Sequence, residues 1–352
     1  MNSNSISLAV IALTAVVSSL ILTGMVRQRA VRWAVIDHPN ERSSHSVPTP
    51  RGGGIGVFLV VAAYLLWAWH SGWLATRVVL ALGVGGAAVA VAGWVDDLRS
   101  LSAGPRLAVQ FAAAFWALVL LGGLPSIQLG AITVALGKFG FVIALLGIVW
   151  STNLFNFMDG IDGIAGVETV CMALFGAALL IRKDAFGLAG FELALAGAML
   201  GFLAWNWHPA KIFLGDVGSG FVGFSLATAA VASENSGAVP AVLWIILGSV
   251  FLVDATLTLL SRIRRGYWHQ AHKDHVYQRA VQAGLSHSQV SLLVVLINVV
   301  LGILALLAAR NRLAPGAALF IGLGVCALVY VAARKLFAAG GTTPRMSSMS
   351  GR

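Results

Sequence analysis

The chain has 352 residues, of which 59% are hydrophobic and only 10% are charged, whereas soluble domains carry roughly 25% charged residues. This composition excludes a soluble globular protein and indicates a membrane protein. The formal net charge of +10 does not indicate nucleic-acid binding, because the basic residues lie at the ends of apolar segments and not on one continuous face. Cys171 and Cys326 both lie in apolar runs, so neither a disulfide framework nor a cysteine metal site is expected.

Apolar segments along the chain are long enough to cross a membrane, which takes about 20 residues. The first, residues 6–26, is followed by Arg27, Arg29 and Arg32. A cleavable signal peptide has its positive charges before the apolar segment and not after it. We therefore expect a retained helix with its N-terminus outside. The others lie at residues 52–70, 77–95, 107–124, 139–155, 164–181, 189–205, 217–233, 239–260, 289–309 and 316–334. The sequence therefore predicts an all-α, polytopic integral membrane protein with about 11 transmembrane helices in a single domain.

The hydrophilic segments alternate between the two sides of the membrane. The cytoplasmic side would receive the loops at about 27–51, 96–106, 156–163, 206–216 and 261–288 and a C-terminal tail, residues 335–352, that we expect to be disordered. With Arg334 at the edge of the tail, these segments hold 17 of the 23 Lys and Arg residues, as the excess of positive charge on the cytoplasmic side requires. Most acids fall in the same loops. Because acids carry little topological information, membrane orientation does not explain this bias, and a shared site on the cytoplasmic face does.

The first candidate for that site is the adjacent pair Asp96 and Asp97, placed where the third helix would emerge from the membrane. Like charges repel, so the pKa of one carboxyl should be raised unless a cation compensates. The pair suits a general base or a metal ligand. The competing interpretation is an interfacial acid pair solvated by headgroups and water.

A second candidate is the segment 153–163, in which Asn153, Asn156, Asp159 and Asp162 recur at three-residue spacing. On a helix these positions drift around one side, and the glycines allow the backbone to turn toward a ligand. Carboxylate and amide oxygens are hard ligands that suit Mg²⁺. The competing interpretation is a polar cap on a membrane helix.

Two more loops carry candidate residues. In the segment 206–220, Asp216 between two glycines could face a cation, and Phe213 offers an aromatic surface for a base, although Gly-Ser turns are common between membrane helices. In the longest loop, His272, His275 and Arg279 share a helical face. This spacing favours phosphate binding over zinc, which would need a third ligand, and the competing interpretation is an ordinary basic cytoplasmic loop.

A glycine run, residues 52–54, follows Arg51 at the start of the second apolar segment. Its glycines favour close helix packing, and Arg51 is a candidate contact for phosphate or a lipid headgroup.

Jointly, these residues resemble the polyprenyl-phosphate N-acetylhexosamine-1-phosphate transferases of glycosyltransferase family 4, from Asp37 to about His287. The matching motifs are Pro-Thr-Pro-Arg-Gly-Gly-Gly at 48–54, Asp96-Asp97, and the segments 153–163, 213–219 and 272–279. The resemblance implies an enzyme of the bacterial inner membrane that takes a UDP-N-acetylhexosamine and undecaprenyl phosphate as substrates, releases UMP and uses Mg²⁺, with Mn²⁺ as the alternative ion. A homodimer is left open.

The resemblance also implies roles for single residues. It assigns the metal to Asp216, Asn153 and Asp97. It assigns catalysis to Asp96, Asp97, Asp159 and His272, without deciding which acid is the base. It assigns substrate binding to Arg51, Asn156, Asp162, Asn206, Phe213, His275 and Arg279, with Phe213 against the uracil ring and Asp162 and Asn206 near the nucleoside.

Several alternatives stay open at this point. The order His272-Lys273-Asp274-His275 is closer to the enzymes that initiate O-antigen or enterobacterial common antigen than to phospho-N-acetylmuramoyl-pentapeptide transferase, which has adjacent histidines there. The sugar, N-acetylglucosamine or a deoxy relative such as N-acetylfucosamine, is undecided. Three other functions are also considered. A transporter would need acids near the membrane midplane, and a non-catalytic scaffold would not need metal-ligand spacing in several loops. A CDP-alcohol phosphotransferase would pack its acids into one dense motif.

Overall fold

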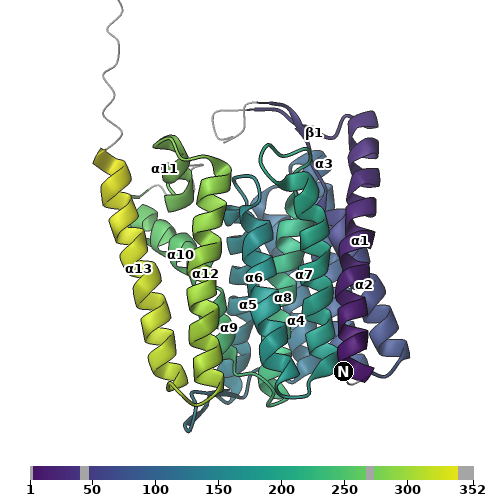
Figure 1. Cartoon of the computed structure of the whole chain (residues 1–352), viewed down its shortest axis with the longest axis vertical. Coiled ribbons are helices and arrows are strands. Elements are labelled where there is room, and N and C mark those ends of the chain that lie inside the picture. The colour runs from purple at the N-terminus through teal and green to yellow at the C-terminus, as the bar shows by residue number, and fades with distance from the viewer. Residues whose placement is uncertain (1–2, 40–46, 267–272, 340–352) are drawn as a thin grey trace, which may run out of the picture.

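The computed structural model describes residues 3–39, 47–266 and 273–339, and in them helices run side by side as one bundle (Figure 1). The helices are α1 (Ser3–Arg32), α2 (Gly54–His70), α3 (Thr76–Arg99), α4 (Ala103–Leu121), α5 (Lys138–Met158), α6 (Ile164–Ile181), α7 (Phe186–Asn206), α8 (Asp216–Asn235), α9 (Ala241–Leu247), α10 (Ser249–Arg264), α11 (Val276–Gln282), α12 (His287–Ala309) and α13 (Pro315–Ala339).

Two short antiparallel strand pairs join helices at opposite ends of the bundle. Strand β1 (Ile36–Asp37) pairs with β2 (Thr49–Pro50) between α1 and α2. Strand β3 (Ser126–Gln128) pairs with β4 (Thr133–Ala135) between α4 and α5. Strand β1 and helix α11 lie at the same end of the bundle, away from the N-terminus (Figure 1).

The predicted all-α membrane architecture is confirmed. Among the described residues, eight helices are long and apolar enough to cross a membrane, and the pair α9–α10 would make a ninth. That pair corresponds to the apolar segment 239–260, which the sequence indicated as one span, but it is bent by 76° at Gly248. Helix α2 is apolar but has only 17 residues.

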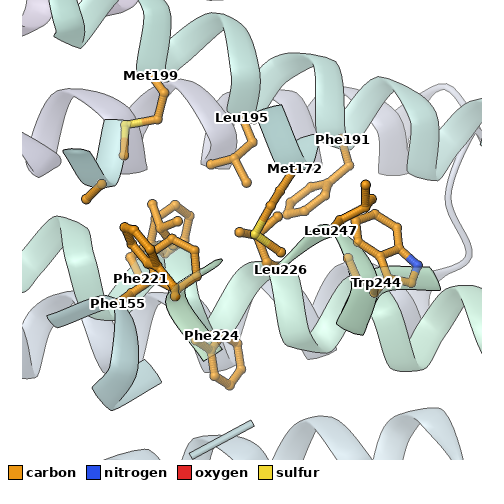
Figure 2. Packing of buried hydrophobic residues seen from close by; sticks show 14 of the residues in the cluster. Phe155, Met172, Phe191, Leu195, Met199, Phe221, Phe224, Leu226, Trp244 and Leu247 are labelled. Atoms are coloured by element: carbon orange, nitrogen blue, oxygen red, sulfur yellow. The ribbon is translucent and has the colours of Figure 1, made fainter. Parts of the chain in front are cut away.

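The core lies between α6, α7 and α8, whereas α1 and α13 present most of their apolar surface to the outside. Figure 2 shows Phe191, Leu195 and Met199 of α7 opposite Phe221 and Leu226 of α8, all fully or almost fully buried. Exposed apolar side chains on the outer helices are expected where lipid is the solvent. The central trio therefore forms a packed frame around which the other helices are arranged.

Glycines bring three helices close together beneath the candidate site. A Cβ at Gly54 would overlap Gly218 on α8, and a Cβ at Gly93 would overlap the backbone of Asp216. Such close approach is the usual reason for small residues at membrane helix contacts. The packing of α2 and α3 on the start of α8 therefore depends on these glycines and fixes where Asp216 lies.

Candidate active site

Asp97 joins the end of α3 to the beginning of α8. Its Oδ1 and Oδ2 accept hydrogen bonds from the backbone N–H groups of Asp216 (3.0 Å) and Val217 (3.2 Å). The first N–H groups of a helix have no partner within the helix and attract negative charge. Gly215, at φ +77°, has no room for a side chain because a Cβ would meet Asp97. Two acids 119 residues apart are thus held side by side.

Arg106 bridges the other member of the acid pair to Asp216. Its Nη1 lies 2.6 Å from Oδ2 of Asp96 and 3.2 Å from Oδ2 of Asp216. Asp96 also accepts the backbone N–H of Leu101 (2.5 Å). Because the connection between α3 and α4 is only three residues long, 100–102, Asp96 and Asp97 lie in the last turn of α3 and not in an open loop. The guanidinium supplies the compensating cation that adjacent carboxylates need.

The amides of α5 approach the same acids from another side. Nδ2 of Asn156 donates to Oδ1 of Asp216 (2.6 Å) and to Oγ of Ser219 (3.2 Å). Nδ2 of Asn153 donates to Oε1 of Gln110 (2.6 Å). Asn153, Asn156, Asp216 and Gln110 line one cavity of about 20 Å³ together with Arg106, which is room for about one water-sized species.

Arg51 faces the acids from the connection between α1 and α2. Its Nη2 lies 2.7 Å from Oδ2 of Asp37, and its Nη1 lies 3.8 Å from Oδ1 of Asp97. Burial alone would lower the pKa of the Arg51 guanidinium, but the hydrogen bond to Asp37 and the nearby carboxylates raise it above its ordinary value. Arg51 is therefore a permanent positive charge at the edge of the acid cluster.

Asp159 and Asp162 lie in the turn between α5 and α6, and their surroundings shift their pKa values in opposite directions. Burial, together with the charges of Asp216 and Asp97, raises the pKa of Asp159 well above its ordinary value. Burial would also raise the pKa of Asp162, but hydrogen bonds from His287 and His208 outweigh it and lower that pKa. Asp159 is thus suited to carry a proton, and Asp162 to remain ionised.

Asn206 and Phe213 brace the connection between α7 and α8. Oδ1 of Asn206 accepts the N–H of Gly163 (2.9 Å), and its Nδ2 donates to the carbonyl of Ile212 (3.0 Å). The N–H of Phe213 donates to the carbonyl of Pro50 (2.8 Å), and its carbonyl accepts the N–H of Gly53 (2.9 Å). Both residues therefore hold the loops of the site together, and the Phe213 side chain is only partly buried.

Helix α11 and its approach cover the turn after α5. Oδ1 of the buried Asp254 lies 3.3 Å from Nδ1 of His275, and the same carboxylate accepts the N–H of Val276, at 3.0 Å to Oδ2. The hydroxyl of Tyr277 donates to the carbonyl of Phe157 (3.0 Å), and a Cβ at Gly160 would overlap that hydroxyl. Residues 275–277 are thus fastened to α10 through Asp254 and to the end of α5 through Phe157.

Asp274 pairs with two arginines. Its Oδ1 lies 3.0 Å from Nη2 of Arg279, and its Oδ2 lies 3.0 Å from Nη1 of Arg262. The predicted substrate residue Arg279 is therefore held by the acid that stands beside His275 in the sequence. His272, a predicted catalytic residue, lies outside the described residues.

The site as a whole gathers hard oxygen donors and fixed positive charges at one end of the bundle. Asp216 and Asn153 line the same cavity, and Asp97 lies against the backbone of Asp216; all three carry carboxylate or amide oxygens of the kind that Mg²⁺ prefers. A carboxylate has about four lone-pair positions, so the hydrogen bonds that Asp97 and Asp216 already accept leave capacity for an ion. The donor set fits Mg²⁺, and the arginines suit phosphate groups.

Sequence reasoning missed four residues of this constellation: Arg106, Gln110, Asp254 and Tyr277. Arg106 could have been found from its position ten residues after Asp96, because paired acids require a nearby cation. Gln110 and Asp254 could have been found as polar side chains within apolar segments, whereas Tyr277, an aromatic residue in a basic loop, carries no such signal.

Comparison with known proteins is consistent with this arrangement. A family model described as glycosyl transferase family 4 matches residues 79–234. A probable undecaprenyl-phosphate N-acetylglucosaminyl 1-phosphate transferase of Bacillus subtilis (strain 168) is 31% identical over 315 residues, which cover 86% of this chain and 85% of the relative. A decaprenyl-phosphate N-acetylglucosaminephosphotransferase of Mycobacterium leprae (strain TN) is 34% identical, with coverage of 82% and 80%. A phospho-N-acetylmuramoyl-pentapeptide-transferase of Geobacillus kaustophilus (strain HTA426) is 30% identical, with coverage of 73% and 82%.

Proposed function

This chain belongs to glycosyl transferase family 4, and from that premise we propose that it transfers an N-acetylhexosamine 1-phosphate from a UDP-sugar to undecaprenyl phosphate. A phosphate oxygen of the lipid attacks the phosphorus that carries the sugar. The bond from that phosphorus to the bridging oxygen breaks, and UMP leaves with the bridging oxygen. The product is an undecaprenyl diphosphate sugar, the first intermediate of a cell-surface polysaccharide.

The observation that carries the proposal is the meeting of Asp97, Asp216 and Asn156, from α3, α8 and α5, next to Arg106. Transfer between two phosphates needs little covalent chemistry from the protein and depends on positioning and charge neutralisation. When bound, Mg²⁺ would be held by Asp216, Asp97 and Asn153 and would neutralise charge on the diphosphate.

The chain's own residues would divide the remaining work. Arg51 and Arg279 bind phosphate oxygens, and Asp274 holds Arg279 in place. Asp159 is suited to hold a proton because burial and the charges of Asp216 and Asp97 raise its pKa, whereas Asp96 lies beside Arg106 as a candidate base toward the lipid phosphate. Phe213 stacks on the uracil ring, and Asp162 and Asn206 bind the nucleoside.

The sugar is N-acetylglucosamine or a deoxy relative. The relatives from B. subtilis and M. leprae are named for N-acetylglucosaminyl phosphate transfer, which favours N-acetylglucosamine as the donor sugar. The peptidoglycan reaction is the second candidate, because a relative of that type matches over 73% of this chain. The loop argues against it, since Asp274 stands between Lys273 and His275 and pairs with Arg279 and Arg262.

We place the site on the cytoplasmic face of the inner membrane and the N-terminus outside. The support is the concentration of basic residues in the segments that carry the site. UDP-sugars are made in the cytoplasm, and this orientation would expose Arg51 and Phe213 to them.

The test is UMP release by the purified protein with undecaprenyl phosphate and Mg²⁺. UDP-N-acetylglucosamine, UDP-N-acetylfucosamine and the UDP-N-acetylmuramoyl-pentapeptide are compared as donors, and we expect the first or second to be used. Asp216→Asn should abolish release, whereas Asp184→Asn, in the exposed turn before α7 at the other end of the bundle, serves as the matched control. Turnover only with the pentapeptide donor, or full turnover in excess EDTA, would overturn the proposal.

A separate measurement tests the base-stacking role. Phe213→Ala should raise the KM for the UDP-sugar by about 5–150-fold, since base–aromatic stacking contributes about 1–3 kcal/mol, and leave the KM for undecaprenyl phosphate nearly unchanged. Equal increases in both KM values would contradict it.

A further inference from the structure

A second group of potential metal ligands lies next to the acid site. Asp162, His208 and His287 come from the turn after α5, the connection after α7 and the first residue of α12. One ligand atom of each lies within 4.8 Å of the other two. Two imidazoles and a carboxylate from three distant segments thus converge at one point.

The separations in this cluster suit a tetrahedral ion. Oδ2 of Asp162 lies 3.3 Å from Nδ1 of His287, and two ligand atoms bound at about 2.0–2.1 Å to a tetrahedral ion stand about 3.3–3.4 Å apart. Nδ1 of His208 is nearer, at 2.6 Å from the same oxygen, so its ring would withdraw by under about 1 Å to admit an ion. The His208 side chain is 41% exposed and has room to do so.

The hydrogen bonding of His287 leaves a conflict that a cation would relieve. Its Nδ1 lies 3.3 Å from the backbone N–H of Asp162 and 3.3 Å from Oδ2 of the same residue. A single ring nitrogen can accept from the first or donate to the second, but not both. When Nδ1 is unprotonated, its single lone pair has the N–H and Oδ2 of Asp162 as neighbours, and an ion bound between Nδ1 and Oδ2 would replace the N–H as the partner of that lone pair.

The surrounding hydrogen bonds hold the cluster in place. Oγ of Ser291 donates to the carbonyl of Asp162 (3.1 Å), and the N–H of Ala210 donates to Oδ2 of Asp162 (3.1 Å). The side chains of Asp162 and His287 are only 7% and 8% exposed. Ligands oriented by such partners bind a metal more tightly than mobile ones.

We propose that Asp162, His208 and His287 bind a Zn²⁺-type transition-metal ion, with a fourth position open on the solvent side of His208. Imidazole ligands favour Zn²⁺ and its neighbours over Mg²⁺, so this site and the oxygen-only site around Asp216 select different ions. The bound ion fastens the turn after α5 to the connection after α7 and to α12. Because the same carboxylate is proposed above to bind the nucleoside, the ion and the UDP-sugar would compete for Asp162.

Cobalt absorption tests the proposal without reference to activity. Protein purified without a histidine tag is titrated with Co²⁺, which absorbs visible light strongly in a tetrahedral nitrogen–oxygen site. We expect one Co²⁺ per chain, displaced by equimolar Zn²⁺ but not by excess Mg²⁺. His208→Ala and His287→Gln should each weaken binding by at least about 10–100-fold, the loss seen when even an orienting partner of a ligand is removed.

Two control variants separate this site from others. His70→Ala removes an exposed histidine at the end of α2, and Asp216→Asn removes the proposed Mg²⁺ ligand; both should keep the cobalt band. His208→Ala alters a half-exposed side chain, so an unchanged elution profile on size exclusion can establish that the variant is folded. A band that persists in either histidine variant, or that Mg²⁺ displaces as readily as Zn²⁺, would overturn the proposal and leave the three side chains as a hydrogen-bonded cluster.

Discussion

Arg106 makes the stability of the metal-free protein depend on a single guanidinium. Its Nη1 joins Asp96 and Asp216 at 2.6 and 3.2 Å, and Arg106→Gln would leave these two carboxylates facing each other without their cation. Hydrogen bonds to charged groups contribute about 1.5–3 kcal/mol each. Because the Arg106 side chain is 31% exposed, solvent screening reduces this contribution, and we expect the variant to lose about 1–3 kcal/mol of stability in EDTA.

Mg²⁺ should restore part of this loss. In the wild-type protein the ion has to share Asp216 with Arg106, whereas in the variant it relieves the repulsion between two carboxylates. A ligand at 100 times its Kd stabilises by about 2.7 kcal/mol, and the stabilisation increases as Kd falls. We expect Arg106→Gln to have the lower Kd for Mg²⁺, so at the same Mg²⁺ concentration its rise in Tm over EDTA should be larger than that of the wild type.

The assay is thermal unfolding of detergent-purified protein in EDTA and in Mg²⁺. Arg99→Gln is the matched control, because Arg99 is an exposed cation at the end of α3, near the same acid pair in the sequence. A Tm for Arg106→Gln that equals that of Arg99→Gln in EDTA, or an identical Mg²⁺ response in all three proteins, would refute the reasoning.

Three further substitutions test other parts of the site. Asp159→Asn should abolish UMP release yet stabilise the protein at pH 7–8. The pKa of Asp159 is raised in the folded state, so the wild-type protein loses stability as the pH rises from the pKa that Asp159 has in the unfolded chain through its pKa in the folded protein. A variant whose Tm keeps the wild-type pH dependence would contradict this. Tyr277→Phe loses the hydrogen bond to the carbonyl of Phe157 and should lower the free energy of unfolding by about 0.5–1.5 kcal/mol, measured by denaturant titration; no loss would mean that the hydroxyl does not fasten α11. Asp254→Leu leaves the N–H of Val276 without its acceptor and should increase proteolysis of the loop after α10, and an unchanged cleavage rate would contradict that link.

The long helices could be predicted because they are apolar runs, whereas the seven-residue α11 has no such run. The break at Gly248 could not, since Pro240 stands at the start of the run 239–260 and only one glycine interrupts the run after it, and glycines elsewhere, such as Gly93, lie within unbroken helices. What bends the chain there is how α9 and α10 pack on the rest of the bundle, which a hydropathy pattern does not contain. The same holds for the strand pair at 36–37 and 49–50, where each strand is only two residues long.

The acids of the site could be predicted, but their partners could not. Asp97 and Asp216 stand out because carboxylates beside glycines and helix ends are uncommon in an apolar chain. The sequence does not reveal that Asp97 caps α8, that Asn156 rather than Asn153 bonds to Asp216, or that Asp162 meets His208 and His287. These contacts depend on which helices are neighbours and at what height along the bundle, and the glycine contacts set both.

The proposed magnesium site is the central claim, and manganese binding tests it most directly. Mn²⁺ replaces Mg²⁺ at oxygen-rich sites, and electron paramagnetic resonance counts the ions that excess Mg²⁺ displaces. We expect one such ion per chain in the wild-type protein and in Asp184→Asn, and none in Asp97→Ala or Asp216→Asn. Retention of the Mg²⁺-displaceable ion in both Asp97→Ala and Asp216→Asn would contradict the account, because the metal would then lie away from the junction of α3 and α8.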